Sequence, residues 1–563
     1  MLRAGITAIA GFLSCLMIAV SQQPFHVDYS DAEAHELKPH RRTIPTQGVA
    51  GGFNQLKLTL QVNATGDVLH ADADGQPKDM KFWPSLQTEV SQWKFRPFEV
   101  DGKPIAAEVE EYIDLVPTER LPQIHIEPPV VRPNSNIEIT LERTGCMGRC
   151  PGYMLMLSGT GIMFDGRGYT VADGVHHAPL EREAIRALAQ RFAAADFYSF
   201  QDEYHAGVTD SPTYVLNVSI DGKHKQVVDY VGQWVGMPAV VHDLEDAADE
   251  VARSDRWIAG GPGLVDALRA EQYHFKTFEA QVMLKNAIER GQTQTVQDFL
   301  AAGVPLKPIP APKPKEPYMG IPYDHQGWLT VAASHPQILQ LLIAAEASKD
   351  DQEDKNLALL EAAQTGSVMS FRALVNYGAD PHANLNGLTV TESGGGMTMQ
   401  EPGSGTYLIY AASSGNPEMV REVLRYKPNL EARGRQGKTA LIAAGDYRNS
   451  VPENARVECV RLLVKAGANV NGTDNDGNTA LHETFLTEVE KELLALGANV
   501  NARNNSGETP IFTTYDKDAI PLYIAHGADL TIRNKDGKTV FEAATNPVKL
   551  DALRKAVAEH ASH

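Results

Sequence analysis

The sequence has few cysteines for its length, with four among 563 residues. A scaffold held together mainly by disulfides is therefore excluded, because such proteins are short and dense in cysteine. Basic residues are also in deficit: 51 Lys and Arg stand against 71 Asp and Glu, a formal net charge of −20. Nucleic acids and anionic membranes require a basic footprint. We therefore expect neither to be the main partner.

Long hydrophobic runs are lacking after the first twenty residues. At the start, Met1 to Arg3 precede an uncharged, mostly apolar run from Ala4 to Val20. This layout predicts a signal peptide over residues 1–21, cleaved after Ser21, and export to the periplasm or the medium. An uncleaved anchor is the alternative, since a run of 17 residues reaches the short limit of a spanning helix. Lipidation at Cys15 is a weaker alternative, because the residues after it stay apolar.

Several catalytic signatures are missing as well. The sequence has no phosphate-cradling glycine loop, no His-Glu-x-x-His and no Gly-x-Ser-x-Gly elbow. His205, Asp210 and Ser211 suggest a serine nucleophile with a base, but the Asp-Ser-Pro segment is typical of an ordinary turn. We predict no catalytic residues, no cofactor and no metal site, and an enzyme is the less favoured class.

A repeated phrase is the strongest positive signal. Gly-x-Thr followed by a small or apolar residue begins at Gly437, Gly477, Gly507 and Gly537, at spacings of 40, 30 and 30 residues. Helical repeat proteins have a unit of about 33 residues. The phrase therefore predicts a stack of short helical units.

Each unit has helix start and stop signals. Thr479 and Thr509 are expected to cap a first helix, with Pro510 at its first position. Gly467, Gly497 and Gly527 fit the left-handed stop of a second helix. This pattern resembles the ankyrin repeat. The resemblance implies an all-α solenoid over residues 275–546 and a protein as partner. We count about seven units, and fewer if the stretch from Trp328 to Ala345 is not a true repeat.

Two features depart from the regular repeat. Thr389 to Glu401 alternate about a glycine turn and predict a hairpin between units, while Asp446 to Asn454 lengthen one helix connection. The two units of 30 residues are short, so we expect the turn between their helices to be clipped.

An α+β domain is predicted before the repeats, at residues 50–117. The expected order is a strand from Leu56, a strand from Val68, a helix over 83–92, a strand over 92–98 and a strand from Ile105 to Leu115. Trp93, Phe95 and Pro97, followed by Gly102, Pro104 and Ile105, resemble the C-terminal domain of TonB. The resemblance implies the periplasm of a Gram-negative cell, and Trp93 and Phe95 are interpreted as core residues.

A second α+β domain is predicted at residues 134–260, after a Pro-rich connector. The segment from Cys146 to Tyr153 reads Cys-x-Gly-x-Cys-Pro-x-Tyr, and Thr209 and Asp210 follow later. These residues resemble an uncharacterised bacterial domain family that brings no known activity. A hairpin is expected about Asp221-Gly222, followed by a helix over 238–253.

Cys146 and Cys150 have three interpretations. A disulfide is favoured for two reasons. Gly148 allows a tight turn that brings the two cysteines together, and the predicted compartment is oxidising. A redox dithiol is the second, since Arg143 and Arg149 could lower a thiol pKa, although the spacing is not Cys-x-x-Cys. A metal site would need two more ligands, for which His176, His177 and His205 are available without any fixed position. Cys459 is interpreted as a buried apolar residue.

Taken together, the sequence predicts two small α+β domains followed by an all-α ankyrin solenoid. The favoured function is an exported protein that binds a protein partner in the cell envelope. Five cations on inter-repeat loops are the candidate partner-binding residues: Arg433, Arg435, Arg503, Arg533 and Lys535. The alternatives are solvated surface charge at these positions, and a redox or other enzyme that acts through the cysteine domain while the repeats recruit its substrate.

Overall fold

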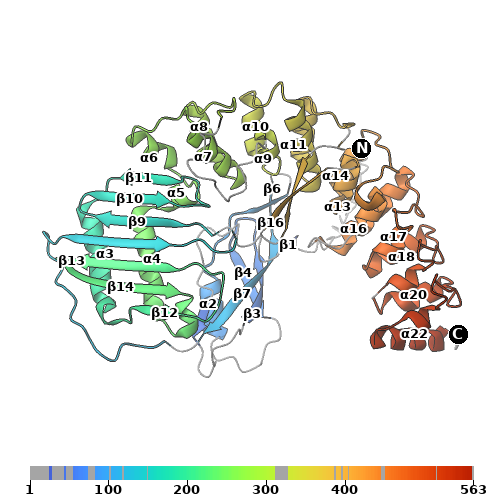
Figure 1. The fold of residues 1–563 in the computed structure, drawn as a ribbon, viewed down its shortest axis with the longest axis horizontal. Helices are drawn as coiled ribbons and strands as arrows, with labels where there is room; N and C mark the ends of the chain where they lie inside the picture. Colours follow the sequence, from blue (N-terminus) through green and yellow to red (C-terminus); the bar gives the residue numbers. More distant parts are fainter. Residues whose placement is uncertain are drawn as a thin grey trace, which may run out of the picture. The chain divides into compact units, whose positions relative to one another are not determined.

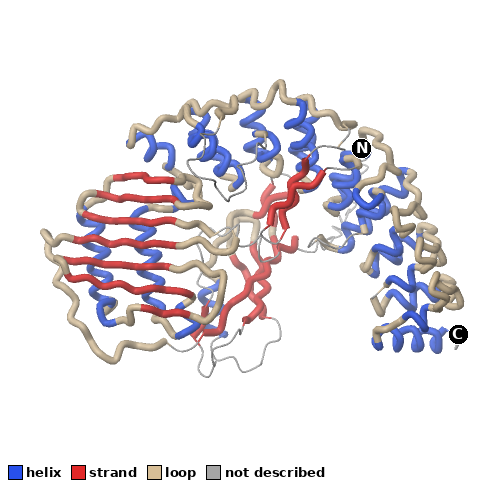
Figure 2. The backbone as a smooth tube through the Cα atoms, viewed as in Figure 1, coloured by secondary structure: helices blue, strands red, loops and turns tan. Residues whose placement is uncertain are grey.

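We describe the protein from a computed structural model. The structure describes residues 25–27, 43–45, 55–73, 83–100, 103–116, 119–148, 150–310, 327–383, 385, 389–394, 397–402, 405–445, 451–514 and 516–560. The predicted signal peptide, residues 1–21, lies outside them. Strands predominate in the N-terminal half and helices in the C-terminal half, which is consistent with ankyrin repeats (Figure 2). None of the described helices is both long and apolar enough to span a membrane.

The N-terminal strands form one main sheet. Its order is β1-β7-β3-β4, with β2 also paired to β7, and β5 pairs with β6 separately. The elements are β1 (Phe25–Val27), β2 (Thr43–Pro45), β3 (Gln55–Val62), β4 (Val68–Ala73), α2 (Trp83–Val90), β5 (Phe98–Val100), β6 (Lys103–Ile105) and β7 (Ala107–Val116).

One predicted strand of this region, over residues 92–98, is present only in part. Lys94 and Phe95 are bridge residues, with Lys94 opposite Asp67, and β5 begins at Phe98. Pro97 has no N–H to donate to a ladder, which explains the interruption. Trp93 and Phe95 are buried, as predicted. The chain passes so close at Gly66 that a Cβ there would lie 1.9 Å from the carbonyl oxygen of Phe95.

The middle domain is a seven-stranded sheet of order β11-β10-β9-β8-β13-β14-β12. Helices α3 and α4 pack on one face of it and lie behind the strands in Figure 1. The strands are β8 (Ile137–Arg143), β9 (Tyr153–Ser158), β10 (Gly161–Gly166), β11 (Gly174–Ala178), β12 (Glu203–His205), β13 (Tyr214–Ile220) and β14 (Lys223–Tyr230). The helices are α3 (Arg182–Ala194), α4 (Ala239–Ala252), α5 (Asp255–Ile258) and α6 (Leu264–Ala270).

Local sequence signals place two of these elements correctly. Asp221 and Gly222 have φ of 52° and 84°, so the β13–β14 hairpin turns where predicted. Helix α4 follows Pro238 and ends at Arg253, whose φ is 51°.

The described C-terminal residues form eight pairs of helices. The pairs are α7 (Phe278–Glu289) with α8 (Thr293–Ala301), α9 (Trp328–Ala332) with α10 (Pro336–Ala344), α11 (Gln352–Gln364) with α12 (Val368–Asn376), α13 (Tyr407–Ser413) with α14 (Pro417–Leu424), α15 (Ala440–Ala444) with α16 (Glu453–Ala466), α17 (Ala480–Glu483) with α18 (Thr487–Ala495), α19 (Pro510–Thr513) with α20 (Ala519–Ala525), and α21 (Val540–Ala543) with α22 (Pro547–His560). First helices contact the first helices of the next pair along the array.

The helix pairs extend beyond the predicted end of the repeats. The last pair continues past residue 546 to His560, while the number of repeat units stays a prediction. The stretch from Trp328 to Ala345 is a true helix pair. Thr479 caps its helix as predicted, in a capping box with His482, whereas Thr509 holds the N-cap position without a capping hydrogen bond from its side chain.

The two short units are shortened in their first helices and not, as predicted, in the turn between helices. Three residues connect α17 to α18, as many as connect α11 to α12, so the turn is not clipped. Instead the first helices α17 and α19 have four residues each. The predicted hairpin is present as β15 (Thr389–Gly394) and β16 (Met397–Pro402), with Thr389 opposite Pro402. Part of the Asp446–Asn454 insertion lies outside the described residues.

The middle domain and the first helix pair share buried polar contacts. Asn286 of α7 donates from Nδ2 to the carbonyl oxygen of Thr170 at 3.1 Å, and Thr295 of α8 donates from Oγ1 to that of Gly260 at 2.6 Å. Buried apolar residues continue from the sheet into the helix pairs as one cluster. The middle domain therefore covers the end of the array, as a capping unit does.

Candidate functional site

A row of polar side chains crosses one end of the middle sheet. Tyr153 of β9 pairs with Arg143 of β8, Arg143 with Tyr214 of β13, and Tyr214 with Asp229 of β14. Directly opposed residues point to the same face of a sheet. These four side chains therefore lie on the face that α3 and α4 cover, in line with core residues such as Leu216.

Helix α4 places a second polar row against the first. His242, Glu245 and Asp249 follow at i, i+3 and i+7, so they share one side of the helix. The side of a helix that packs on a sheet is ordinarily apolar. Here Glu245 is only 1% exposed. At one end of the interface between α4 and the sheet, polar side chains thus occupy positions that are ordinarily apolar.

Direct contacts hold the two rows in place. The Tyr153 hydroxyl donates to Asp249 Oδ2 at 2.6 Å, and the Ser254 hydroxyl donates to Asp249 Oδ1. His242 Nδ1 lies 3.2 Å from Glu245 Oε2. Asp229 Oδ1 accepts a hydrogen bond of 2.6 Å from the Gly232 N–H.

Burial dominates the electrostatics of the carboxylates. It raises the pKa of Glu245 to about 7 and that of Asp249 to about 6, and it also raises the pKa of Asp229. The hydrogen bond to Glu245 raises the pKa of His242 to about 9. A carboxylate is costly to ionise when it is desolvated without a cation, and that cost appears as a raised pKa. The site can therefore hold protons or accept a positive charge.

Three residues of these two rows have the donor set of a cation site. Asp229, His242 and Glu245 each offer one ligand atom, and these atoms lie within 4.8 Å of one another. We predicted no metal site and no functional residues here. The available signal was the polar spacing at 242, 245 and 249 within an otherwise apolar helix face, but its meaning depends on the strand register.

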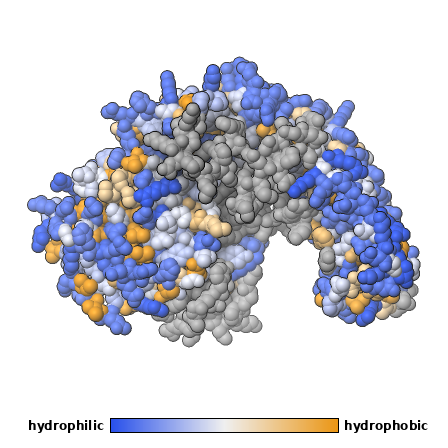
Figure 3. All heavy atoms as spheres, viewed as in Figure 1, coloured by the Kyte–Doolittle hydropathy of each residue, from blue (hydrophilic) through white to orange (hydrophobic). Residues whose placement is uncertain are grey.

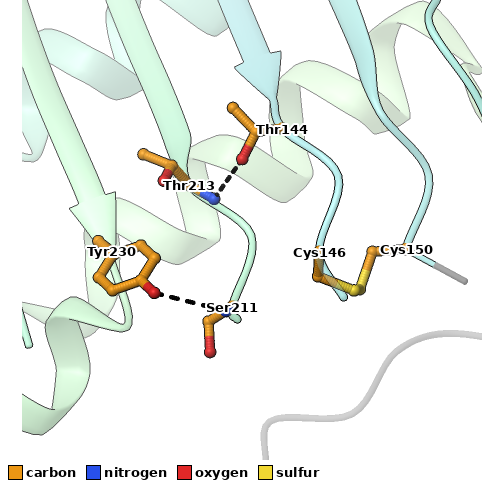
Figure 4. The surroundings of a disulfide bond; sticks show 6 residues. All are labelled: Thr144, Cys146, Cys150, Ser211, Thr213 and Tyr230. Carbon is orange, nitrogen blue, oxygen red and sulfur yellow. Dashed lines mark hydrogen bonds between the residues drawn. A yellow bond between two sulfur atoms is a disulfide. The ribbon is translucent and has the colours of Figure 1, made fainter. Parts of the chain in front are cut away.

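The predicted cysteine pair lies in the loop between β8 and β9 (Figure 4). Cys146 and Cys150 are joined as a disulfide in the structure, with their Cα atoms 5.5 Å apart. The neighbouring β13 connection is fixed to this loop, because the Thr213 N–H donates to Thr144 Oγ1 at 2.9 Å. Arg143, proposed to activate a thiol, has its guanidinium carbon 5.1 Å from the centre of the Tyr214 ring. Arg149 lies outside the described residues.

The histidines considered as partners of the cysteines have other contacts. His176 is buried, with Nδ1 3.4 Å from Glu271 Oε2, and His205 stacks on Tyr230 at 4.6 Å between ring centres. The Ser211 N–H also contacts Tyr230, at its hydroxyl (Figure 4). Among the described contacts, His205 and Ser211 both meet Tyr230 and do not form a nucleophile and base pair with each other.

Two residues of the repeats have structural roles. Cys459 is buried, and burial raises its thiol pKa to about 12, so it behaves as an apolar side chain. His482 contacts the Thr479 hydroxyl through Nδ1 at 2.9 Å and the carbonyl oxygen of Glu508 through Nε2 at 3.1 Å. It thereby ties one repeat to the next.

All five predicted partner-binding cations are exposed. Three of them also donate hydrogen bonds to backbone carbonyl oxygens of the loops. Arg433 donates to Gly437 at 3.5 Å. Arg503 donates to Arg533 at 2.7 Å, and Arg533 donates to Gly537 at 2.6 Å. One inter-repeat loop lacks such a cation, because Thr473 stands at the position that arginine holds in the other loops. The surface of the last helix pairs is mostly hydrophilic on the face that Figure 3 displays.

Comparison with known families identifies two parts of the chain. Residues 137–252 match the family described as Domain of unknown function (DUF6438), and residues 451–483 match Ankyrin repeats (many copies). The chain thus has ankyrin repeats at its C-terminal end and this domain of unknown function in its middle. The TonB-like N-terminal domain stays a prediction.

Similar proteins share only limited segments with this chain. Diacylglycerol kinase iota of Rattus norvegicus and that of Mus musculus are each 32% identical to it over 149 residues, which is 26% of this chain and 11% of the kinase. The chain therefore spans about a tenth of the length of these curated relatives. The crystal structure of the human ASB11 ankyrin repeat domain is 22% identical, covers 41% of this chain and 97% of its own, and has a TM-score of 0.33.

Proposed function

We propose that this is an exported protein whose ankyrin repeats bind a protein partner in the cell envelope. The observation that carries the proposal is the ankyrin repeats themselves, whose loop tips and helix faces offer a broad binding surface and which rarely perform chemistry. In this proposal the middle domain caps the array, and the TonB-like domain positions or tethers the chain.

The inter-repeat loops are the proposed contact surface. Arg433, Arg435, Arg503, Arg533 and Lys535 are exposed there in a chain of net charge −20. Local positive charge on an acidic protein favours an acidic partner and speeds its association. We therefore propose that the partner presents an acidic surface to these tips.

Charge reversal in the full chain tests this proposal. We choose Arg435→Glu with Lys535→Glu, which changes one exposed cation on each of two loops. The matched control, Lys465→Glu with Lys555→Glu, makes the same change in net charge at exposed helix positions. Affinity capture from the native envelope should lose the partner with the loop variant and keep it with the control. Equal capture by both variants would remove the charged tips from the proposal.

Export is tested separately. N-terminal sequencing of the chain recovered from a Gram-negative host should begin at Gln22 if residues 1–21 are a cleaved signal. A chain that begins at Met1 in the cytoplasm would overturn the proposed location.

A further inference from the structure

The group formed by Asp229, His242 and Glu245 is not used by the proposed partner-binding function. Asp229 comes from the end of β14, whereas His242 and Glu245 come from consecutive turns of α4. One ligand atom of each lies within 4.8 Å of the other two. Nitrogen and oxygen donors at these separations surround a space of the size of a single cation.

Glu245 supplies a second, independent observation that points to a bound cation. Its side chain is buried, and its Oε1 atom has no hydrogen-bond partner among the described residues. Its other oxygen faces His242 Nδ1 at 3.2 Å. A buried carboxylate oxygen without a partner is costly, and proteins ordinarily pair such an atom or coordinate a metal with it.

The orientation of the Asp229 carboxylate is fixed by its neighbours. The N–H of Gly232 fixes Oδ1, and such outer-shell hydrogen bonds orient metal ligands. A Cβ at Gly232 would lie 2.9 Å from Asp229 Oδ1 and 2.9 Å from Met237 Sδ. Glycine at this position therefore keeps the Asp229 carboxylate in place.

The charges around the group favour a cation. Asp246 lies on the same helix and interacts electrostatically with His242 and Glu245. From the sheet, Tyr214 faces the cluster, and Arg143 supplies positive charge beside Tyr214. Asp229, Glu245 and Asp246 thus supply three carboxylates around one histidine, with one arginine beside Tyr214.

The group is also open to solvent on one side. The His242 side chain is 31% exposed, while Glu245 closes the inner end. Three protein ligands with an open fourth position are typical of zinc sites that bind a water or a further ligand. One imidazole and two carboxylates suit zinc better than magnesium or calcium, which take oxygen ligands only.

We propose that Asp229, His242 and Glu245 bind one divalent transition-metal ion, with Zn²⁺ bound more tightly than Mn²⁺. The order follows from the general affinity series of nitrogen and oxygen sites for first-row metals. The site belongs to the middle domain alone and is independent of the partner proposed for the repeats.

Metal titration of the full-length, tag-free chain tests this inference. After EDTA treatment and dialysis under non-reducing conditions, calorimetric titration with Zn²⁺ should show one site per chain, and elemental analysis should recover one zinc. E245Q and D229N should each weaken this binding by at least about 100-fold. D243N, which alters an exposed carboxylate of the same helix, should bind as the unchanged chain does.

Two further measurements keep the test decisive. If E245Q or D229N loses its far-UV circular dichroism, H242Q changes the most exposed ligand and should still abolish the site. Co²⁺ bound in place of Zn²⁺ should give d–d absorption without a thiolate charge-transfer band, because no cysteine belongs to the group. Less than a tenth of a zinc per chain, unchanged affinity in H242Q, or a thiolate band that assigns the metal to Cys146 and Cys150 would each overturn the proposal.

Discussion

At the scale of single residues, buried carboxylates carry much of the distinctive chemistry of this chain. Glu490 on α18 is completely buried, and its Oε1 accepts a hydrogen bond of 2.8 Å from the Tyr523 hydroxyl. Burial raises the pKa of Glu490 from 4.5 to about 7. Because its folded-state pKa is raised, Glu490 favours the folded state while it is protonated and opposes folding once it ionises.

This shift predicts a pH dependence of stability. Between about pH 4.5 and 7 the unfolded chain has released the Glu490 proton and the folded chain still holds it, so stability falls as pH rises. Glu490→Gln should therefore raise the free energy of unfolding above pH 7, by up to about 3 kcal/mol, and change it little at pH 4.5. Thermal unfolding at both pH values checks this. Glu488→Gln changes an exposed position of the same helix and should have the same effect on the free energy of unfolding at both pH values. A pH-independent effect of Glu490→Gln would contradict the account.

Asp354 joins neighbouring repeats through its carboxylate. It is 3% exposed and accepts hydrogen bonds of 3.0 Å from the N–H groups of Leu329 and Thr330 at the start of α9. Asp354→Ala would leave these donors without their acceptor. We expect a loss of about 2–4 kcal/mol of stability, because the bonds are buried and charge-assisted. Urea unfolding of this variant beside Asp350→Ala, an exposed neighbour, measures the difference, and equal stabilities would refute the bridging role.

At the scale of elements, the Cys146–Cys150 loop predicts a small effect of reduction. The cross-link closes only a short loop, so it contributes little chain entropy, about 2 kcal/mol or less. Cys146→Ser with Cys150→Ser should lower the melting temperature by only a few degrees and leave zinc binding unchanged. Thiol labelling of the native protein supplies the control: a blocked pair supports the structural role, whereas a labelled low-pKa thiol would favour the redox alternative.

Element types and turns could be predicted where the signal is local. The Asp221-Gly222 turn, the Thr479 cap and α4 all depend on residues within a few positions of one another. The predicted strand over 92–98 is reduced to bridges at Lys94 and Phe95, because Pro97 interrupts the pairing that its apolar alternation favours. Local patterns therefore locate elements better than they predict pairing.

The candidate site could not be predicted for a related reason. Asp229 and Glu245 meet only because β14 pairs with β13 in one register and α4 packs on that end of the sheet. In the sequence, Glu245 is one of 71 acidic residues. Its significance comes from one buried carboxylate oxygen, Oε1, that has no hydrogen-bond partner among the described residues, which only the packed structure reveals.

At the scale of the whole molecule, the middle domain and the repeats share one continuous core. A chain that starts at residue 275 would expose the surface of α7 and α8 that now meets Thr170 and Gly260. Terminal repeats without a cap expose apolar surface, so this truncation should melt at a lower temperature and aggregate. Calorimetry beside the full chain measures the effect, and an unchanged melting temperature would show that the repeats stand alone.

Partner binding by the inter-repeat loops is the central claim, and site-specific photocrosslinking in living cells tests it most directly. A photoreactive residue at the exposed tip position Lys535 should capture one protein of defined size, and the same residue at the exposed helix position Lys465 should not. The account predicts that the captured band disappears when Arg435→Glu is added. Capture from neither position, or the same bands from both, would contradict it.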